Sequence, residues 1–545
     1  MRGSDPSPPD GGTRLPGLLD WCLLPLALVL LNLSVTFRNV WPTPAIRLTA
    51  DLSAELAFAT LAVVALQRWW GRVPAAALRA GAVGWVLLVA GRYVDVTTRS
   101  LYGRDVNLYW DFRHVPSVGA MFATVADPWQ VAGAAAVALA VPVALYAGAR
   151  WALGCIARPA ASPLGRRLLG GAAAVVVALF AAVELGWRPI DRLRFADPVA
   201  VAYAREAGEL VYEASGAGLA ALGPAPALAS DLAHVAGADV FVIFLESYGA
   251  VAWESDALSA PLAGSRAQLR TDIRDTGRTV VSALVESTTF GGESWLAHIS
   301  LLSGTEVRDD RTNVRLMAQD RDTLVKLFGR NGYRTVAIVP GLLIDWPEGA
   351  FYGYDEIYDH QRLGYRGPPF GWWSINDQYA LARVDALEVD PRDRPPLFVF
   401  FSTISTHAPF TPAPPYQPDW ARVVSEHPYD REELDRAWSD QPDWTNLAPS
   451  YVEALRYAYA TVGGYLRLRA DRDLVMVLVG DHQPPALVSG EGASWNVPVH
   501  VIASRAELLD RLRARRFHDG LAPRSGAVAR MDELLPVLLG AFGDG

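Results

Sequence analysis

Cysteine is almost absent from this chain of 545 residues, which contains only Cys22 and Cys155. The part of the chain after residue 190 therefore has neither a disulfide framework nor a cysteine nucleophile. Long runs of charge of one sign are also missing, and the formal net charge is −9. A nucleic-acid surface needs clustered lysine and arginine, so the sequence indicates no nucleic-acid partner.

Hydrophobic residues, by contrast, make up 51% of the chain, and the mean hydropathy is +0.15. Each of five apolar segments approaches the ~20 residues that a helix needs to cross a bilayer. A soluble fold rarely contains five such stretches as buried helices, so we predict a five-span transmembrane domain over residues 15–190. The five segments are residues 16–37, 53–70, 76–95, 129–149 and 168–187.

Arginines in the loops predict the orientation of these spans. Cytoplasmic loops carry an excess of Arg and Lys. An odd number of spans then places everything after about residue 190 outside the cytoplasm. The arginines that fall on the predicted cytoplasmic side are Arg2, Arg14, Arg68, Arg72, Arg79, Arg150, Arg158, Arg166 and Arg167.

The remaining segments predict the domain organisation. Residues 1–14 are rich in Pro, Gly and Ser and are expected to form a disordered cytoplasmic tail, and residues 191–236 form a connector. From residue 237 to 545, short apolar runs alternate with helical patterns, which predicts an α/β domain with a mostly parallel central sheet. The strands are expected at 239–246, 333–339, 396–403 and 473–480, and two of the helices at 322–332 and 449–469.

Polar residues with metal-binding groups follow two of these strands. Glu246 follows the first strand, and Asp481 and His482 follow the last. Ligands gather beyond the carboxyl ends of strands in open α/β sheets, so the three side chains are expected to meet at one divalent cation. Two carboxylates with one imidazole suit manganese, our first choice, and also zinc or magnesium. Alternatively, Glu246 caps a turn and the Asp-His pair belongs to a polar loop.

A third motif, STTFGGESWLAHISLLSG, occupies residues 287–304. Two glycines precede Ser294, and an apolar helical stretch follows it. Ser294 is therefore expected at a helix N-terminus, where free N–H groups and the helix dipole favour a phosphate or an alkoxide. The alternative is a helix-capping serine without a chemical role.

Together these motifs resemble the superfamily of alkaline phosphatases, sulfatases and lipoteichoic acid synthases, whose nucleophile begins a helix. Residues 302–304, Leu-Ser-Gly, stand where sulfatases have Leu-Thr-Gly. The resemblance implies one divalent metal ion, a bacterial cytoplasmic-membrane location, and a periplasmic or extracellular sulfatase-like catalytic domain over 237–545. It also implies that His407, within Thr-His-Ala-Pro-Phe, binds substrate. The metal ligands that it implies are Glu246, Ser294, Asp481 and His482.

Departures from the family patterns refine these expectations. Leu296 and His298 replace the Pro and Arg that type I sulfatases need to convert the nucleophile to formylglycine. Ser294 is therefore expected to act as an unmodified hydroxyl, which favours phosphoryl transfer over sulfate ester hydrolysis. Trp346 stands where the synthases have a Trp-Asn-Arg segment for glycerol phosphate, but the Arg is absent. His298 and Trp346 remain candidate substrate-binding residues.

The resulting functional hypothesis is a membrane-embedded, metal-dependent transferase or hydrolase that acts on phosphodiesters through a covalent Ser294 intermediate. The resemblance implies a phosphoglycerol-type head group, a lipid or glycan donor and an envelope acceptor. The alternatives are a membrane-bound sulfatase or phosphodiesterase that uses water, and a non-catalytic envelope sensor. The oligomeric state stays open.

Overall fold

The computed structural model describes most of the chain, and the predicted tail at 1–14 lies outside the described residues. The described residues form two compact units. The first comprises those within 1–40, 44–99 and 105–214, and the second those within 41–43, 100–104 and 215–545. The described residues are 17–40, 45–102, 106–112, 115–116, 119–120, 123, 126–187, 193–215, 222, 225–226, 228–343, 345–443, 445–490 and 492–544.

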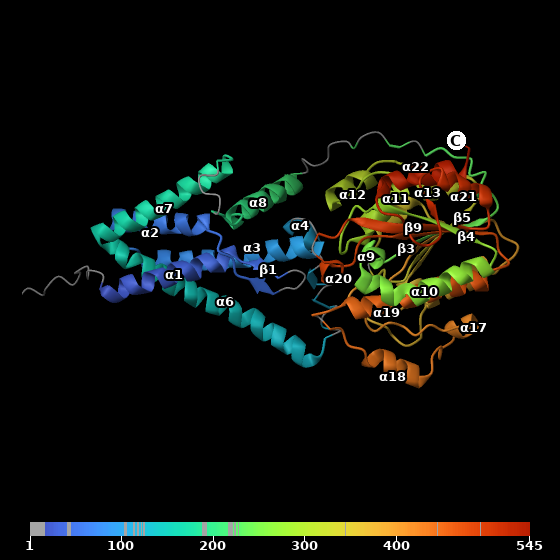
Figure 1. The fold of residues 1–545 in the computed structure, drawn as a ribbon, viewed down its shortest axis with the longest axis horizontal. Helices are drawn as coiled ribbons and strands as arrows, with labels where there is room; N and C mark the ends of the chain where they lie inside the picture. The colour runs from blue at the N-terminus through green and yellow to red at the C-terminus, as the bar shows by residue number, and fades with distance from the viewer. Residues whose placement is uncertain are drawn as a thin grey trace, which may run out of the picture. The chain divides into compact units, whose positions relative to one another are not determined.

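The first unit is a bundle of long helices (Figure 1). In this bundle α1 packs against α6, and α2 packs against α7. Its smaller elements are α4 (Leu108–Asp111), η2 (Pro159–Ala161), α8 (Val199–Ser215), β1 (Arg38–Asn39) and β2 (Ile46–Arg47). The long helices are α1 (Leu18–Thr36), α2 (Ala54–Trp70), α3 (Ala75–Tyr102), α6 (Pro128–Ala157) and α7 (Pro163–Glu184).

A helix therefore occurs at each of the five predicted apolar segments. Among the described residues, four helical segments are long and apolar enough to cross a membrane: Leu18–Thr36, Ala75–Arg99, Pro128–Ala160 and Pro163–Glu184. The remaining helix, α2, has 17 residues. At 1.5 Å per residue it is roughly 26 Å long, slightly shorter than a ~30 Å hydrocarbon core. The count of five spans thus stays a prediction.

A mixed, mostly parallel sheet forms the centre of the second unit. Its order is β10-β4-β9-β8-β3-β7-β5-β6, and β11 pairs with β4. The run from β8 to β6 is parallel, whereas β9 is antiparallel to both β8 and β4. The strands are β3 (Asp239–Leu245), β4 (Thr279–Glu286), β5 (Arg334–Val339), β6 (Glu356–Asp359), β7 (Leu397–Ser402), β8 (Leu474–Gly480), β9 (Asn496–Ala503), β10 (His518–Asp519) and β11 (Ala527–Arg530).

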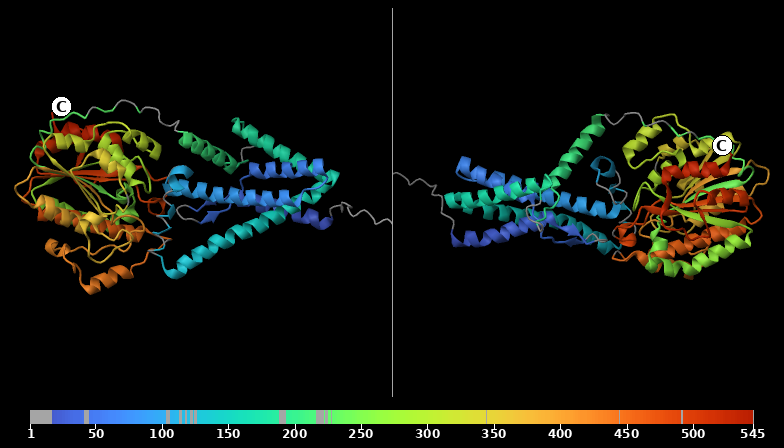
Figure 2. Two further views of the ribbon diagram at one scale, coloured as in Figure 1. Left: turned by 180° about the vertical axis from the view of Figure 1, so that it is seen from behind. Right: turned by 45° about the horizontal axis from the view of Figure 1, so that its top comes forward.

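Helices cover both faces of this sheet (Figures 1 and 2). One face packs against α11 (Ser294–Ser303), α13 (Leu324–Arg330), α21 (Ala506–Arg513) and α22 (Met531–Phe542). The other packs against α10 (Asp256–Asp275), α16 (Asp377–Val384) and α19 (Ala448–Leu468). The shorter helices are α9 (Val251–Glu254), α12 (Asp310–Met317), α14 (Pro347–Tyr352), α15 (His360–Leu363), η3 (Asp385–Val389), α17 (Trp420–Val423), α18 (Arg431–Ser439) and α20 (Ala486–Ser489).

The four strands expected from the sequence correspond to β3, β5, β7 and β8, each within a residue or two of the predicted bounds. All four are nearly fully buried. Burial on both faces by two helix layers explains their continuous apolar runs. Because α10 and α19 pack side by side on one face, two segments that are far apart in the sequence contribute to a single hydrophobic core.

Candidate functional site

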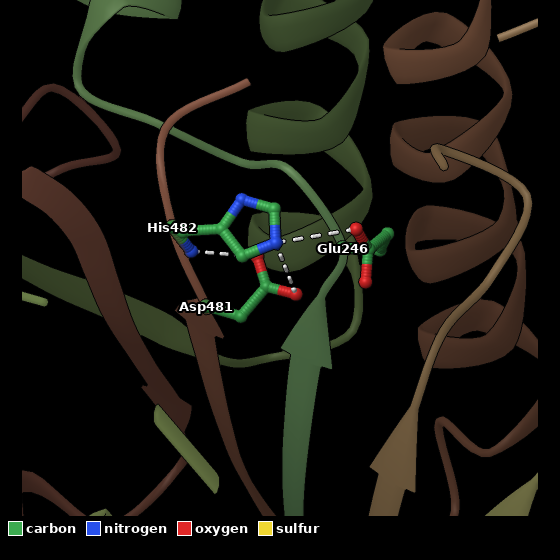
Figure 3. A group of neighbouring side chains, drawn as sticks. All are labelled: Glu246, Asp481 and His482. Atoms are coloured by element: carbon green, nitrogen blue, oxygen red, sulfur yellow. Dashed lines mark hydrogen bonds and ion pairs between the residues drawn. The ribbon is translucent and has the colours of Figure 1, made fainter. Parts of the chain in front are cut away.

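The candidate site forms where the carboxyl ends of two neighbouring parallel strands meet. Leu245 at the end of β3 pairs with Gly480 at the end of β8, so the residues that follow them emerge together. Figure 3 shows the side chains of Glu246, Asp481 and His482 pointing toward one another. One potential ligand atom from each residue lies within 4.8 Å of the others, and all three residues are buried.

Two glycines allow the loops after β3 and β8 to approach this closely. A Cβ atom on Gly480 would lie 1.9 Å from the carbonyl oxygen of Tyr248, and one on Gly249 would lie 1.8 Å from Oε1 of Gln483. Any larger residue would force the loops apart, because such overlaps cannot be accommodated without backbone movement. The glycines therefore set the spacing between Glu246 and Asp481.

Ser294 is the first residue of α11 and lies directly beside the acidic cluster. Its Oγ donates a hydrogen bond to Oε2 of Glu246 at 2.7 Å and lies 3.2 Å from Nε2 of His482. The helix N-terminus adds unpaired N–H groups and a positive dipole end at the same place. The structure thus brings together all four residues that the sequence analysis assigned to a metal site.

A tight turn presents Ser294 to the cluster. Gly291 has φ 72° and Glu293 has φ 60°, so a non-glycine residue immediately before Ser294 adopts the left-handed region. Thr289 Oγ1 donates to the Gly292 carbonyl at 2.6 Å, and the Gly291 N–H donates to the Gln483 carbonyl at 3.1 Å. A strained conformation of this kind persists only where surrounding contacts hold it, and here those contacts reach the loop of Asp481 and His482.

Hydrogen bonds fix the orientation of both groups after β8. His482 Nδ1 donates to the Gln483 carbonyl at 2.7 Å, so Nε2 is the ring nitrogen that faces Ser294 and Glu246. Such a second hydrogen bond is typical of metal-binding histidines. Asp481 Oδ1 accepts from the backbone N–H groups of Ser247 at 2.8 Å and His482 at 2.6 Å. Its Oδ2 atom is buried and has no hydrogen-bond partner.

Electrostatics in this cluster are strongly coupled. Burial raises the pKa of Asp481, and the neighbouring Glu246 carboxylate raises it further. Burial alone would lower the pKa of His482, but Asp481 and Glu246 outweigh it and raise that pKa to about 9. Burial alone would raise the pKa of Glu246, yet His482 and His407 keep it well below its usual value. The carboxylates of Glu246 and Asp481 thus share the positive charge of one imidazole, that of His482.

A divalent cation fits these residues. Among the described residues, His482 is the only ion-pair partner of Glu246 or Asp481. Buried charges need compensation, and Oδ2 of Asp481 is a buried acceptor without a hydrogen bond inside the cluster. Glu246, Asp481, His482 and the Ser294 hydroxyl offer the oxygen and imidazole donors that manganese, zinc or magnesium accept.

The three residues proposed to bind substrate lie in different surroundings. His407 Nδ1 donates to the Ala408 carbonyl at 2.7 Å, which leaves Nε2 as an acceptor, and its ring meets Trp372 edge-on at 5.1 Å between ring centroids. His407 is also one of the groups whose charge lowers the pKa of Glu246. Trp346 stacks on Tyr354 at 6.2 Å between ring centroids.

The side chain of His298 is buried among aromatic residues. It is 7% exposed, and its ring packs at 4.4 Å from Phe244 and 5.3 Å from Phe400 between ring centroids. Burial lowers the pKa of His298 to about 3, so the ring is neutral at physiological pH. A direct role for His298 in substrate binding stays a prediction.

Three further residues support the site and were missed by sequence reasoning. Thr403 Oγ1 accepts a hydrogen bond from the Glu246 N–H at 3.0 Å. Asp377 accepts from the N–H groups of Ile404 and Ser405 at 2.8 and 3.0 Å and so anchors the loop that carries His407. Gln483 accepts from Val251 N–H at 3.3 Å through its side chain. Only Gln483 had a signal in the sequence, its place beside the Asp-His pair.

A family model described as sulfatase matches residues 296–501. The match begins two residues after Ser294 and includes His407, Asp481 and His482. The matched residues all lie within the second unit. Comparison with curated proteins finds no match.

Many solved structures are similar to the chain, including the following three. The lipoteichoic acid synthase LtaP from Listeria monocytogenes is 15% identical, with 59% of this chain and 80% of that chain covered and a TM-score of 0.36. The integral membrane lipooligosaccharide phosphoethanolamine transferase EptA from Neisseria meningitidis is 14% identical, with 95% of each chain covered and a TM-score of 0.46. The phosphoglycerol transferase GacH from Streptococcus pyogenes, in complex with sn-glycerol-1-phosphate, is 12% identical, with 56% and 75% covered and a TM-score of 0.34.

Proposed function

We propose that this protein is a membrane-bound, metal-dependent enzyme that transfers or hydrolyses phosphodiester-linked head groups through a phosphoserine at Ser294. The observation that carries the proposal is the position of Ser294 Oγ at the N-terminus of α11, 2.7 Å from Glu246 and 3.2 Å from His482. A hydroxyl so placed can both contact a cation and attack a phosphorus atom held at the helix N-terminus.

In the first step, the Ser294 oxygen attacks the phosphorus in line, and the opposite phosphorus–oxygen bond breaks. A divalent cation at Glu246, Asp481 and His482 would supply the Lewis acidity that lowers the pKa of the Ser294 hydroxyl. The hydroxyl proton points at Glu246 Oε2. N–H groups at the start of α11 stabilise charge on the phosphoryl oxygens. In its protonated form, His407 would donate the proton on Nε2 to the leaving oxygen, while Nδ1 stays bonded to the Ala408 carbonyl.

In the second step, an acceptor hydroxyl or water attacks the phosphoserine, and the Ser294 oxygen leaves. We favour a lipid or glycan phosphodiester as donor and an envelope component as acceptor, since apolar helices would hold the enzyme where such substrates occur. We favour manganese as the cation. Phosphoryl chemistry is preferred over sulfate ester hydrolysis because Leu296 and His298 follow Ser294, which is therefore expected to remain a serine.

The covalent intermediate can be tested with a chromogenic phosphodiester, bis(4-nitrophenyl) phosphate, and the purified full-length chain with manganese. We expect 4-nitrophenolate release and, after rapid acid quenching, a 4-nitrophenyl phosphoryl adduct on Ser294 in peptide mass spectrometry. The untreated protein should show an unmodified serine at this position. Detection of formylglycine at residue 294, with faster cleavage of 4-nitrophenyl sulfate, would establish the sulfatase alternative instead.

The location outside the cytoplasm can be tested with reporter fusions after residue 545. Five spans and the arginine-rich loops predict that an alkaline phosphatase reporter is active there and that a cytoplasm-dependent fluorescent protein is dark. If α2 does not cross the membrane, the number of spans is four. The second unit would then lie on the same side of the membrane as the N-terminus, which is the cytoplasmic side. The opposite reporter pattern would then be observed, and the proposed compartment would be wrong.

A further inference from the structure

The first unit contains a large cavity that the catalytic proposal does not use. Its volume is about 1120 Å³, and it opens where the start of α1, the end of α2, the start of α3 and the last turns of α6 come together. The apolar part of its wall includes Val73, Leu78 and Ala157. Three arginines and one carboxylate supply the charged part: Arg72, Arg150, Arg158 and Asp20.

Two of these arginines have no partner in the part of the chain that the structure describes. Arg158 lies 3.4 Å from Asp20, and this carboxylate also accepts a hydrogen bond from the Gly17 N–H at 3.0 Å. The side chains of Arg72 and Arg150 form no hydrogen bond or ion pair with any other described residue. The cavity therefore presents two guanidinium groups whose charge the described protein does not balance.

Aromatic side chains place this cavity at the level of lipid head groups. Trp69 and Trp70, at the end of α2, are 77% and 64% exposed, and Trp151 lines the cavity itself. Exposed tryptophans of membrane helices gather at the membrane–water interface. On α6, Trp151 is 22 residues after the exposed Trp129, which is roughly 33 Å of helix and close to the ~30 Å hydrocarbon thickness.

We propose that this cavity binds the phosphate head group of an anionic phospholipid from the adjacent leaflet. The planar guanidinium groups of Arg72 and Arg150 match the geometry of phosphate oxygens and can each donate two hydrogen bonds. The apolar wall contacts the first carbons of the acyl chains. A zwitterionic lipid binds less well, because its ammonium group brings a positive charge into a cavity that already carries an excess of arginine.

The test uses the full-length chain in detergent and native mass spectrometry with equal amounts of phosphatidylglycerol and phosphatidylcholine of identical acyl chains. We expect the wild type to retain phosphatidylglycerol with about 10-fold preference, as two charged contacts support. The double variant Arg72→Gln/Arg150→Gln should lose this preference. Lysine at both positions should keep part of it, since the charge remains but the bidentate geometry is lost.

The matched control is Arg68→Gln/Arg79→Gln, which removes two charges from the same end of α2 and α3 but outside the cavity lining. This variant should bind phosphatidylglycerol like the wild type. An equal loss in both double variants would mean that surface charge, rather than the cavity, attracts the lipid. Displacement of the lipid by millimolar glycerol phosphate would point to a soluble ligand, and equal retention of phosphatidylcholine would show no head-group recognition; either result overturns the proposal.

Discussion

Replacement of Ser294 with alanine is expected to reduce phosphodiester turnover by about 10³-fold or more, because no other group takes over the role of an absent nucleophile. The fold should survive. The change removes two hydrogen bonds, to Glu246 Oε2 and to His482 Nε2, each of which contributes about 1 kcal/mol to stability. Initial rates with bis(4-nitrophenyl) phosphate, together with a thermal unfolding curve, measure both effects on one preparation.

Two further variants separate the chemistry of Ser294 from the packing of its helix. Ser303→Ala removes a hydroxyl from the last turn of the same helix, where Oγ donates only to the Ile299 carbonyl at 2.6 Å. It should keep turnover near the wild-type rate. Ser294→Thr should retain part of the activity, since a hydroxyl remains at the helix start. Wild-type turnover in Ser294→Ala would remove this residue from the mechanism.

Asp481→Asn is expected to abolish the stabilisation of the domain by divalent cations. In the wild type, a cation at 100-fold its dissociation constant should add about 2.7 kcal/mol, or roughly 4 °C in the unfolding midpoint of a domain of this size. Asparagine preserves the shape of the side chain, and its oxygen can still accept from the N–H groups of Ser247 and His482. It removes the charge and the free Oδ2 acceptor.

The same substitution should raise the stability of the metal-free domain. Glu246 and Asp481 are buried together, and burial together with Glu246 raises the pKa of Asp481. Removing one negative charge relieves this repulsion, as expected where a site is built for binding rather than for stability. The unfolding midpoints of both proteins should be measured with EDTA and with manganese, zinc or magnesium.

The two results together distinguish a metal site from a buried acidic core. In EDTA, the Asp481→Asn variant should have a higher unfolding midpoint than the wild type. Addition of the cations should not change the midpoint of the variant. The control Asp355→Asn replaces a carboxylate that accepts from Thr335 N–H at 2.8 Å and should keep the full cation response. A wild type that gains no stability from any of the three cations would contradict the metal assignment.

Much of the site was predictable because its residues follow secondary structure directly. Glu246 and Asp481 each come immediately after a continuous apolar strand, and the carboxyl ends of parallel strands share one edge of a sheet. Ser294 follows two glycines and opens an apolar helix. These patterns are local, so the sequence displays them without knowledge of the fold.

Strands β4 and β9 were missed although they pair along eight residues. They are antiparallel to one another and lie between the parallel core and the edge of the sheet. His500 interrupts the apolar run of β9 and is nevertheless buried, because Ser282 of β4 contacts its Nδ1 at 2.7 Å and Tyr248 contacts its Nε2 at 3.0 Å. From the sequence alone, a polar residue within an apolar run is predicted to be exposed, because its buried hydrogen-bond partners are not visible there.

The sequence by itself determined which long segments are apolar helices and where strands β3, β5, β7 and β8 run, and it predicted which residues bind a cation. Only the tertiary structure decided that Asp377 anchors the loop of His407, that His298 packs between two phenylalanines, and that Arg72 and Arg150 face one cavity. The physical reason is that helix and strand patterns depend on neighbours within a few residues. Burial, hydrogen-bond partners and charge compensation depend on residues that only folding brings together.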